Sequence, residues 1–396
     1  MKQPYRFAPV KKAMQSWIDR EILPGVSYAI LIDGDIVESA CLGYASIENR
    51  KAMMPKTIFR LFSNSKIITS VAALCCLEDG CFSLDEPLEK YIPAFSTLRV
   101  LRKDHSSLED TEALQRKPTV RQLMSHNAGF SYGILSESPV DKLYSARRLL
   151  DPQSSLTEMV AALAEIPLAY QPGTRFLYSI STDVLARLVE VWSGESFGEF
   201  IRRRILNPLS MSDTGFYVPD TEQHRMAAHY VAQTPKTPDA PGLDIMSDAM
   251  MGGYGTPKPL ESGGGGLVST LEDYTRFLKM LIGRGETGGV RILQPETVAI
   301  MTSNQLPAGV SYHSKSWPMP HTGFGLGVAV KAAPHDGEPA QAAGEYHWGG
   351  ISGTHTWVSP GANIACLLFT QKYMSFCQPF AYEFKRLVYR AICGES

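Results

Sequence analysis

The hydrophobic pattern at the two ends of the chain predicts helices and antiparallel strands. Residues 8–21 repeat apolar positions at the spacing of an amphipathic helix. Residues 25–32 are rich in branched and aromatic side chains, and Asp33-Gly34 before Ile36 is typical of a tight hairpin turn. Strand character returns near the C-terminus in residues 324–330, 355–358 and 364–370, before a last helix over residues 379–392.

A helix that is apolar on almost every face is predicted over residues 66–77, and Asp79-Gly80 ends it. A short apolar stretch, residues 57–62, leads into this helix. A helix that is apolar all round is a buried one. Ser63 is therefore expected at the N-terminus of a central core helix.

The middle of the chain, residues 90–289, has a mostly helical pattern. Capping boxes are predicted at Thr119–Gln122 and Ser196–Glu199. Gly129, Gly194 and Gly283 are expected helix ends, and residues 233–257 and 302–322 are rich enough in Pro and Gly to be loops. Strands at both ends with helices between them predict an α/β (α+β) fold. In it, residues 1–89 and 290–396 form an antiparallel sheet flanked by helices, and residues 90–289 form an inserted, mostly helical domain.

Composition is that of an ordinary globular protein: 396 residues, 44% hydrophobic, 20% charged and a formal net charge of −2. This balance gives no reason to expect a nucleic-acid or membrane partner, and Arg202-Arg203-Arg204 lies in a helical pattern that predicts a solvated face. There is no secretory signal pattern and no apolar run of membrane-spanning length. The seven cysteines lack C-x-x-C spacing and the nine histidines lack a ligand pattern. We expect a cytoplasmic protein with reduced cysteines and with no metal or other cofactor.

Ser63-Asn64-Ser65-Lys66 is the one S-x-x-K motif in the chain. Chance alone gives about one or two such matches in a chain of this length, so its location carries the argument. Positions three apart on a helix share a face, so the Lys66 amine can reach the Ser63 hydroxyl. The helix N-terminus favours a developing oxyanion, and apolar surroundings are expected to lower the pKa of Lys66. The pattern predicts a nucleophile and its partner, rather than a capping serine and a lysine extending along the helix.

Tyr178 is the second candidate. It lies between the turn at Gln171–Thr174 and a well-signalled helix beginning at Ser181, at an expected strand-to-helix junction. A phenol relays protons near neutral pH where cations lower its pKa, so the functional interpretation requires Lys66 nearby. From the sequence alone, plain packing explains this tyrosine equally well.

Trp348-Gly349-Gly350 precedes a predicted strand. Paired glycines beside a strand often permit another group to approach the backbone closely, here a substrate along the sheet edge. A plain turn with a buried tryptophan is the alternative.

Gly129-Phe130-Ser131-Tyr132-Gly133 matches G-x-S-x-G, the nucleophile pattern of α/β-hydrolases. That pattern requires a strand before the serine and a helix after it. Here a capped helix precedes the motif and residues 134–140 resemble a loop, so Ser131 is not expected to be the nucleophile. Gly263-Gly264-Gly265-Gly266 lacks the Lys-Ser/Thr of a phosphate loop, and we expect it to serve tight backbone packing.

The order of these motifs resembles class C β-lactamases and their relatives. S-x-x-K is followed about 115 residues later by the tyrosine motif and about 170 residues beyond that by the glycine-containing strand. Lesser landmarks agree in order: Leu84-Asp-Glu-Pro-Leu-Glu-Lys-Tyr-Ile-Pro, Gln122-Leu-Met-Ser-His-Asn-Ala-Gly, Gln171-Pro-Gly and Gly263-Gly-Gly-Gly-Leu-Val-Ser-Thr. The resemblance covers about residues 10–390 and implies a β-lactamase/penicillin-binding-protein-like fold.

Two departures from the β-lactamase pattern are informative. Ile180 stands where the Tyr-x-Asn motif has asparagine, and Trp348-Gly349-Gly350 stands where the family has Lys-Thr-Gly. The missing lysine would receive the carboxylate of a β-lactam or of a peptide C-terminus. An indole there favours neutral groups instead. Both changes resemble family VIII carboxylesterases, so the resemblance implies an esterase.

The resemblance also implies a set of site residues. Ser63 would form an acyl-enzyme with a short-chain ester, with Lys66 or Tyr178 as the base and with the backbone N–H groups of Ser63 and Ile351 holding the oxyanion. Trp348, Gly349, Gly350 and Tyr132 would contact the small-molecule substrate. The alternatives are an acyltransferase on the same scaffold, a β-lactamase or D-amino-acid peptidase with weak ester activity, and a binding module without chemistry.

Overall fold

The computed structural model describes residues 5–103, 107–133, 139–234, 236–247, 253–314, 317–335, 338–376 and 378–393. Its centre is an eight-stranded sheet in which every neighbouring pair is antiparallel. The strand order is β12 (Thr322–Phe324), β13 (Ala329–Lys331), β14 (Tyr346–Gly350), β15 (Thr354–Ser359), β16 (Ile364–Phe369), β1 (Gly25–Ile32), β2 (Asp35–Ser46) and β3 (Lys51–Ala52). Strands from both ends of the chain thus share one sheet, as predicted.

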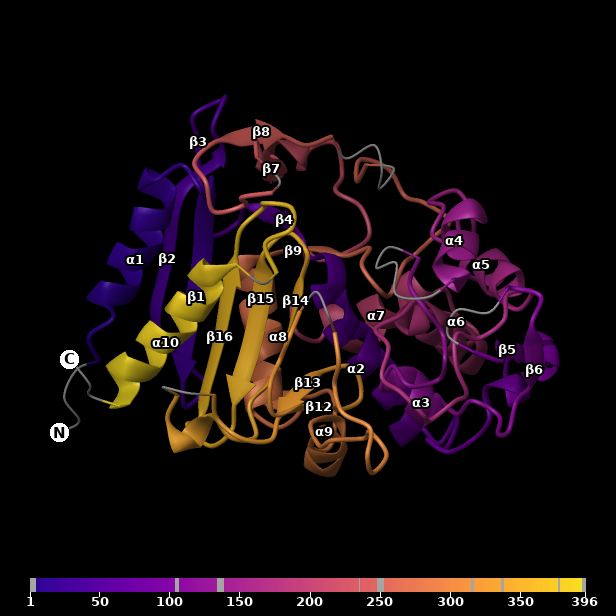
Figure 1. Ribbon diagram of the computed structural model, residues 1–396. Coiled ribbons are helices and arrows are strands. Elements are labelled where there is room, and N and C mark those ends of the chain that lie inside the picture. The colour runs from indigo at the N-terminus through magenta and orange to yellow at the C-terminus, as the bar shows by residue number, and fades with distance from the viewer. Residues whose placement is uncertain are drawn as a thin grey trace.

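Helices cover both faces of this sheet. The terminal helices α1 (Ala8–Asp19) and α10 (Pro379–Cys393) lie side by side on one face, and α8 (Leu271–Ile282) packs on the other (Figure 1). Alternate residues of β1 therefore enter two different hydrophobic clusters: Tyr28 contributes to the one beneath α1 and α10, and Ala29 to the main core. Burial on both faces explains why every residue of β1 is buried.

One predicted strand is wrong. Residues 324–330 form the facing ends of β12 and β13 with a reverse turn between them, closed by a hydrogen bond from the Gly325 N–H to the Val328 carbonyl (2.8 Å). Gly327, at φ +91°, supplies the left-handed conformation that this turn needs. The apolar run is continuous in sequence, but its two glycines bend it back on itself.

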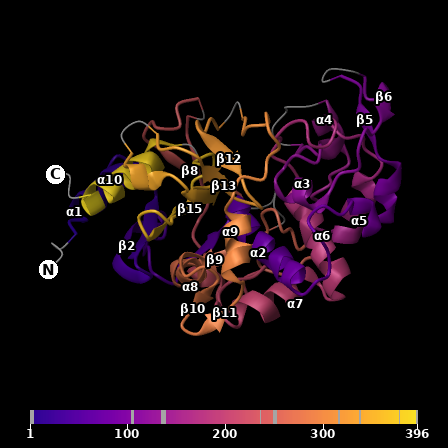
Figure 2. The same cartoon turned by 90° about the horizontal axis from the view of Figure 1, so that it is seen from below.

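The elements between residues 99 and 201 lie to one side of the sheet (Figures 1 and 2), and the middle of the chain is less helical than predicted. The helices of this side part are α3 (Val120–Met124), α4 (Val140–Ala146), α5 (Leu156–Leu163), α6 (Ser181–Ser193) and α7 (Phe197–Ile201). The short strands of the middle form the pairs β5 (Arg99–Leu101) with β6 (Thr111–Ala113) and β7 (Tyr230–Ala232) with β8 (Leu243–Ile245). The middle range also contains β9 (Val268–Thr270) and β10 (Glu286–Thr287), and β11 (Val290–Arg291) and α9 (Pro295–Met301) follow it.

The predicted helix ends fare unequally. The first residue of each predicted capping box caps its helix: the Thr119 hydroxyl accepts from the Gln122 N–H, and the Ser196 hydroxyl accepts from the Glu199 N–H. Gly194 ends α6 in the left-handed conformation at φ +73°. Gly129 does not end a helix, because α3 already stops at Met124 and Gly129 lies in the loop beyond it.

The predicted buried helix is α2 (Ser65–Glu78), whose residues 65–76 are all buried. It packs against α6, and one continuous hydrophobic core runs from the sheet into the helical part. The division into a terminal and an inserted domain stays a prediction; α8 and β9 come from the middle range yet pack with the terminal segments. Among the described residues, no helix is long and apolar enough to cross a bilayer.

Candidate active site

Ser63 lies at the tight turn that connects β4 (Ile58–Arg60) to α2. Phe62, immediately before it, adopts a left-handed conformation at φ +47°, an uncommon state for a bulky residue and typical of functional turns. The hydroxyl of Thr354 donates to the Leu61 carbonyl (2.8 Å) and the amide of Asn64 donates to Thr356 (2.9 Å). Strand β15 therefore fixes the turn from both sides of the nucleophile.

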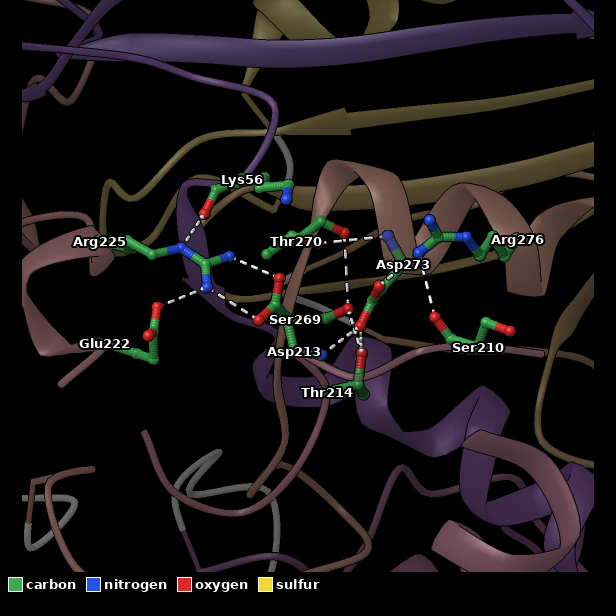
Figure 3. Close-up of polar contacts among 10 residues, drawn as sticks. All are labelled: Lys56, Ser210, Asp213, Thr214, Glu222, Arg225, Ser269, Thr270, Asp273 and Arg276. Atoms are coloured by element: carbon green, nitrogen blue, oxygen red, sulfur yellow. Dashed lines mark hydrogen bonds and ion pairs between the residues drawn. The ribbon is translucent and has the colours of Figure 1, made fainter. Parts of the chain in front are cut away.

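A second strand supports the same turn. Strand β9 pairs with β4, and a polar network below β9 anchors it (Figure 3). Asp273, at the start of α8, accepts from the Asp213 N–H (2.7 Å) and the Thr214 hydroxyl (3.0 Å), while Arg225 bridges Asp213 and the Lys56 carbonyl. The segment leading to Ser63 is thus linked to the start of α8 through Arg225, Asp213 and Asp273.

Lys66 lies one helical turn after Ser63, and its side chain is fully buried. Its Nζ donates to the Gly264 carbonyl (2.5 Å) and lies 3.4 Å from both the Ser63 Oγ and the Tyr132 hydroxyl. The amine also lies over the ring of Tyr178, 4.8 Å from its centroid. The predicted reach from Lys66 to Ser63 is present.

The expected lowering of the Lys66 pKa is wrong. Burial does act to lower it, but Tyr132, Tyr178 and Asp183 together outweigh burial and raise the pKa of Lys66 above its ordinary value. The apolar residues of α2 predict a lowered pKa. The groups that reverse this direction, Tyr132, Tyr178 and Asp183, all come from outside α2.

Asp183, which sequence reasoning missed, lies in the first turn of α6 and is fully buried. Its Oδ1 accepts from the Ser262 hydroxyl and the Gly264 N–H (3.0 Å), so Gly264 links the carboxylate to the Lys66 amine through its own peptide groups. Burial raises the pKa of Asp183, and Lys66 and these donors oppose that rise. In the sequence Asp183 is one more acidic residue at a helix start, with nothing to set it apart.

The glycine run 263–266 packs as tightly as expected. A Cβ on Gly263 would lie 2.8 Å from the Cβ of Ala186, and one on Gly264 would lie 2.3 Å from an oxygen of Asp183. At these two positions no side chain larger than hydrogen fits without displacement, whereas Gly265 has room for a Cβ, whose nearest neighbour would be 3.7 Å away. This close packing is what lets the Gly264 carbonyl reach Lys66.

Tyr178 lies in an irregular segment just before α6, not at the end of a strand. Its hydroxyl accepts a hydrogen bond from the Trp348 indole N–H (3.3 Å), and its ring packs on His126 with centroids 4.9 Å apart. Since the oxygen accepts from Trp348, the phenolic proton must point elsewhere. Tyr178 and Trp348, 170 residues apart in sequence, are therefore direct partners.

Tyr132 contacts Lys66 because the loop that carries it is anchored. Ser131, the serine of the G-x-S-x-G match, is buried and donates to Asp141, and its carbonyl accepts from the Ile180 N–H (3.0 Å). It lies in a loop with no strand before it, so the pattern is not a nucleophile elbow. Most of the predicted loop after it, residues 134–138, lies outside the described residues.

The residues around Trp348 divide into two groups. Trp348, Gly349 and Ile351 line the same cavity as Ser63, Tyr132 and Tyr178. Gly350 instead packs against the nucleophile turn: a Cβ there would lie 2.2 Å from the Leu61 carbonyl oxygen. The close approach predicted from the paired glycines is real, and at Gly350 the approaching group is the chain itself.

The cavity above Ser63 measures about 320 Å³, within the usual range of small-molecule sites. Its lining includes no Asp or Glu among the residues that the structure describes, and Lys258 in it donates to the Gly253 carbonyl. Nine of the residues that line it carry aromatic side chains: Phe62, Tyr132, Tyr178, Phe216, Tyr254, Trp317, Trp348, Tyr373 and Phe376. Such a wall suits an apolar, uncharged ligand.

The chain is similar to known proteins along most of its length. A family model described as Beta-lactamase matches residues 10–388. Protein Rv1367c of Mycobacterium tuberculosis is 32% identical over 83% of this chain and 81% of that protein. The lovastatin esterase of Penicillium rubens is 30% identical over 78% of each.

Among solved structures, EstCE1, described as a hydrolase with promiscuous acyltransferase activity, superimposes with a TM-score of 0.77. The match covers 96% of this chain and 97% of EstCE1, at 26% identity. These comparisons confirm the predicted resemblance and fold class: an antiparallel sheet flanked by helices, with a mostly helical side.

Proposed function

This chain belongs to the beta-lactamase family, and we propose that within it the protein is a serine carboxylesterase that forms an acyl-enzyme on Ser63. The observation that carries the proposal is the group around the Lys66 amine. That amine lies 3.4 Å from the Ser63 hydroxyl and over the Tyr178 ring, at the floor of an aromatic cavity. A serine beside a positioned proton-transfer pair at a helix N-terminus is the arrangement that acyl transfer requires.

In the proposed mechanism Tyr178 reacts as a phenolate, after its proton has passed to solvent, and this phenolate takes the Ser63 proton as Ser63 attacks the ester carbonyl. Lys66 keeps its own proton, as its raised pKa favours, and stabilises the charge that develops beside it. The backbone N–H groups of Ser63 and Ile351 hold the oxyanion. Tyr178 then protonates the departing alcohol, and water releases the acid from Ser63 in a second, mirrored step.

The cavity supports esters over β-lactams or peptides. Trp348 occupies the strand position where the β-lactamase pattern has lysine. Its indole N–H donates to the Tyr178 hydroxyl. Ile180, at the position of their asparagine, is buried in the core and cannot reach a substrate amide. A carboxylate placed against Trp348 would lose its hydration there and would meet an indole ring in place of the lysine.

Acyl transfer to an alcohol is the second candidate, and the shape of the cavity favours it. A volume of about 320 Å³ leaves room for an acceptor beside a short acyl group, and an apolar wall lets an alcohol compete with water. The similarity to a hydrolase with promiscuous acyltransferase activity supports the same view. The product ratio of acid to new ester, measured in rising concentrations of a bulky alcohol, separates the two activities.

Hydrolysis of p-nitrophenyl butyrate by wild type, Ser63→Ala and Ser131→Ala tests the proposal. We expect Ser63→Ala to lose at least a thousandfold in kcat and Ser131→Ala to keep most of it. Ser131 is the matched control, since it is also buried, lies near the site and belongs to a nucleophile-like pattern. Labelling by a fluorophosphonate, located by peptide mass spectrometry, should fall on Ser63.

Folding of each variant is checked by its thermal unfolding midpoint. A folded Ser63→Ala that still hydrolyses the ester would end the proposal, as would exclusive labelling of Ser131. Turnover of a β-lactam at rates that rival the ester would replace the esterase assignment with a lactamase one.

A further inference from the structure

His229 occupies a position between the two halves of the proposed oxyanion hole. It is buried, with 3% of its surface exposed, yet it lines the cavity above Ser63. Its Nε2 shares a hydrogen bond of 2.8 Å with the hydroxyl of Ser352, which is fully buried. Its ring packs on Phe62, with centroids 5.5 Å apart. His229 therefore contacts the residue before Ser63 and the residue after Ile351.

The segment that carries His229 is held by the stretch of chain that follows β16. His229 immediately precedes β7, which lies beside the end of β16 (Figure 1). There the Tyr230 N–H donates to the Gln371 carbonyl (2.9 Å) and the Tyr230 carbonyl accepts from the Tyr373 N–H (2.7 Å). The histidine is thus held on a rigid element and can act as a fixed reference for the groups that it touches.

The Ile351 turn is held on its carbonyl side by the same stretch of chain. It connects β14 to β15 and is closed by the Gly353 N–H donating to the Gly350 carbonyl (3.0 Å). The carbonyls of Ile351, Ser352 and Gly353 accept from the N–H groups of Ser375 (2.8 Å), Lys372 (3.1 Å) and Thr370 (3.1 Å). The Ser352 hydroxyl adds a side-chain bond to His229, whose ring packs on Phe62, the residue before Ser63.

We propose that His229 is a positioning residue for the oxyanion hole. Through Ser352 it sets the orientation of the Ile351 N–H, and through Phe62 it supports the strained residue that aims the Ser63 N–H at the same point. The inference rests on the proposed function, since it needs an acyl-enzyme on Ser63. No sequence motif marks this histidine. In the part of the chain that the structure describes, no hydrogen bond joins it to the Ser63 hydroxyl, so its proposed role is indirect.

The alternative role for a cavity-lining histidine is substrate contact, and the two roles leave different kinetic signatures. Loss of a substrate contact raises KM, whereas a misplaced oxyanion donor lowers kcat and leaves KM nearly unchanged. Removing one donor outright costs about a hundred- to a thousandfold in kcat. A donor that is displaced but still present should cost less, about ten- to a hundredfold.

The test uses His229→Ala, His229→Gln, Ser352→Ala and the double variant His229→Ala/Ser352→Ala, with p-nitrophenyl butyrate as substrate. Each single alanine variant should lower kcat by about ten- to a hundredfold and change KM by less than about threefold. The double variant should be no slower than the slower single one, because both remove the same bond. His229→Gln should recover most of the rate, since its terminal amide can replace the Nε2.

A transition-state analogue supplies a readout that a purely structural role would not move. The inhibition constant of a trifluoromethyl ketone, which forms an oxyanion on the serine, should rise by the same factor by which kcat/KM falls. A change confined to KM, additive losses in the double variant, or an unchanged inhibition constant would each overturn the inference. Ser352→Ala removes a single hydroxyl and keeps the test valid if His229→Ala does not fold.

Failure of the inference can be told apart from failure of the proposed function. If Ser63→Ala retains the activity, the proposed function is wrong. If Ser63→Ala is inactive while the His229 and Ser352 variants behave as wild type, the esterase assignment stands and the role of His229 is wrong.

Discussion

Replacing Asp183 with asparagine should reveal which protonation state of Lys66 the reaction uses. The carboxylate of Asp183 and the Lys66 amine are joined through one residue, Gly264, whose N–H donates to the first (3.0 Å) and whose carbonyl accepts from the second (2.5 Å). Asparagine keeps the acceptor oxygen and nearly the same shape. It removes the negative charge, which is one of the groups that raise the pKa of Lys66 against the effect of burial.

The size of the effect follows from this geometry. One intervening residue separates the charges by roughly 7 Å, which at an effective dielectric constant of about 20 is worth about 2 kcal/mol. Since one pKa unit corresponds to about 1.4 kcal/mol, the pKa of Lys66 should fall by between about one and two units. If Lys66 must be protonated, as we propose, the alkaline limb of the kcat/KM profile should move to lower pH by that amount.

The assay is hydrolysis of an unactivated ester with direct measurement of the released acid, because nitrophenol absorbance itself changes with pH. Since the pKa of Lys66 lies above its ordinary value, the profile runs from pH 5 to above pH 11, with the uncatalysed rate subtracted at each pH. A downward shift of the acid limb alone would show that Lys66 acts as a neutral base and would refute our assignment. Two unmoved limbs in a folded variant would refute the charge coupling itself. Asp273→Asn is the matched control: Asp273, on α8, is also a buried carboxylate that accepts a backbone N–H and a hydroxyl (Figure 3), and it is not among the groups that raise the pKa of Lys66.

Three further predictions follow from other contacts. Tyr132→Phe removes one acceptor of the Lys66 amine and should lower kcat about tenfold, as measured with p-nitrophenyl butyrate. Ser131→Ala breaks the buried bond to Asp141 and should lower the free energy of unfolding in urea by about 1–3 kcal/mol. Burial lowers the pKa of three histidines, to about 4 in one case, so below about pH 6.5 the unfolded chain binds protons that the native chain cannot. The free energy of unfolding should therefore fall by about 4 kcal/mol between pH 7.5 and 5.5. An unchanged value would refute the lowered pKa values of these three residues, His126, His347 and His355.

The fold was predictable where local pattern and burial agree. Helix α2 is apolar all round because it is enclosed by α6, the sheet and the helical part, and its sequence shows this directly. The hairpin of β1 and β2 was predicted from the Asp33-Gly34 pair alone. Both residues take positive φ, as a two-residue hairpin turn requires. The predicted strand over 324–330 failed because apolar residues on either side of Gly325 and Gly327 look continuous until the turn is seen.

The site was predictable where residues lie close in sequence and less so where the fold unites distant segments. Ser63 and Lys66 share one helix face, so their spacing alone brought them together. Asp183 and Gly264 approach Lys66 from α6 and from a glycine run, and neither has a local signature of that contact. The reversed direction of the Lys66 pKa is the consequence, because electrostatics depends on neighbours that a local pattern does not contain.

The raised pKa of Lys66 and the presence of Trp348 on β14 both favour uncharged substrates. Asp183 balances the charge of Lys66 beneath the site, so that pair presents little net charge to the cavity floor. Above it, Trp348 directs its N–H to Tyr178 and its ring to the cavity wall. A neutral ester can fill this space while its developing oxyanion meets the Ser63 and Ile351 N–H groups. A substrate with a carboxylate beside the reacting carbonyl must place that charge against the indole ring, which costs roughly 1 kcal/mol or more without a partner. If Ser63 and Lys66 act as we propose, the indole of Trp348 on β14 in place of lysine, together with Ile180 in place of asparagine, therefore favours neutral esters over the charged substrates of lactamases.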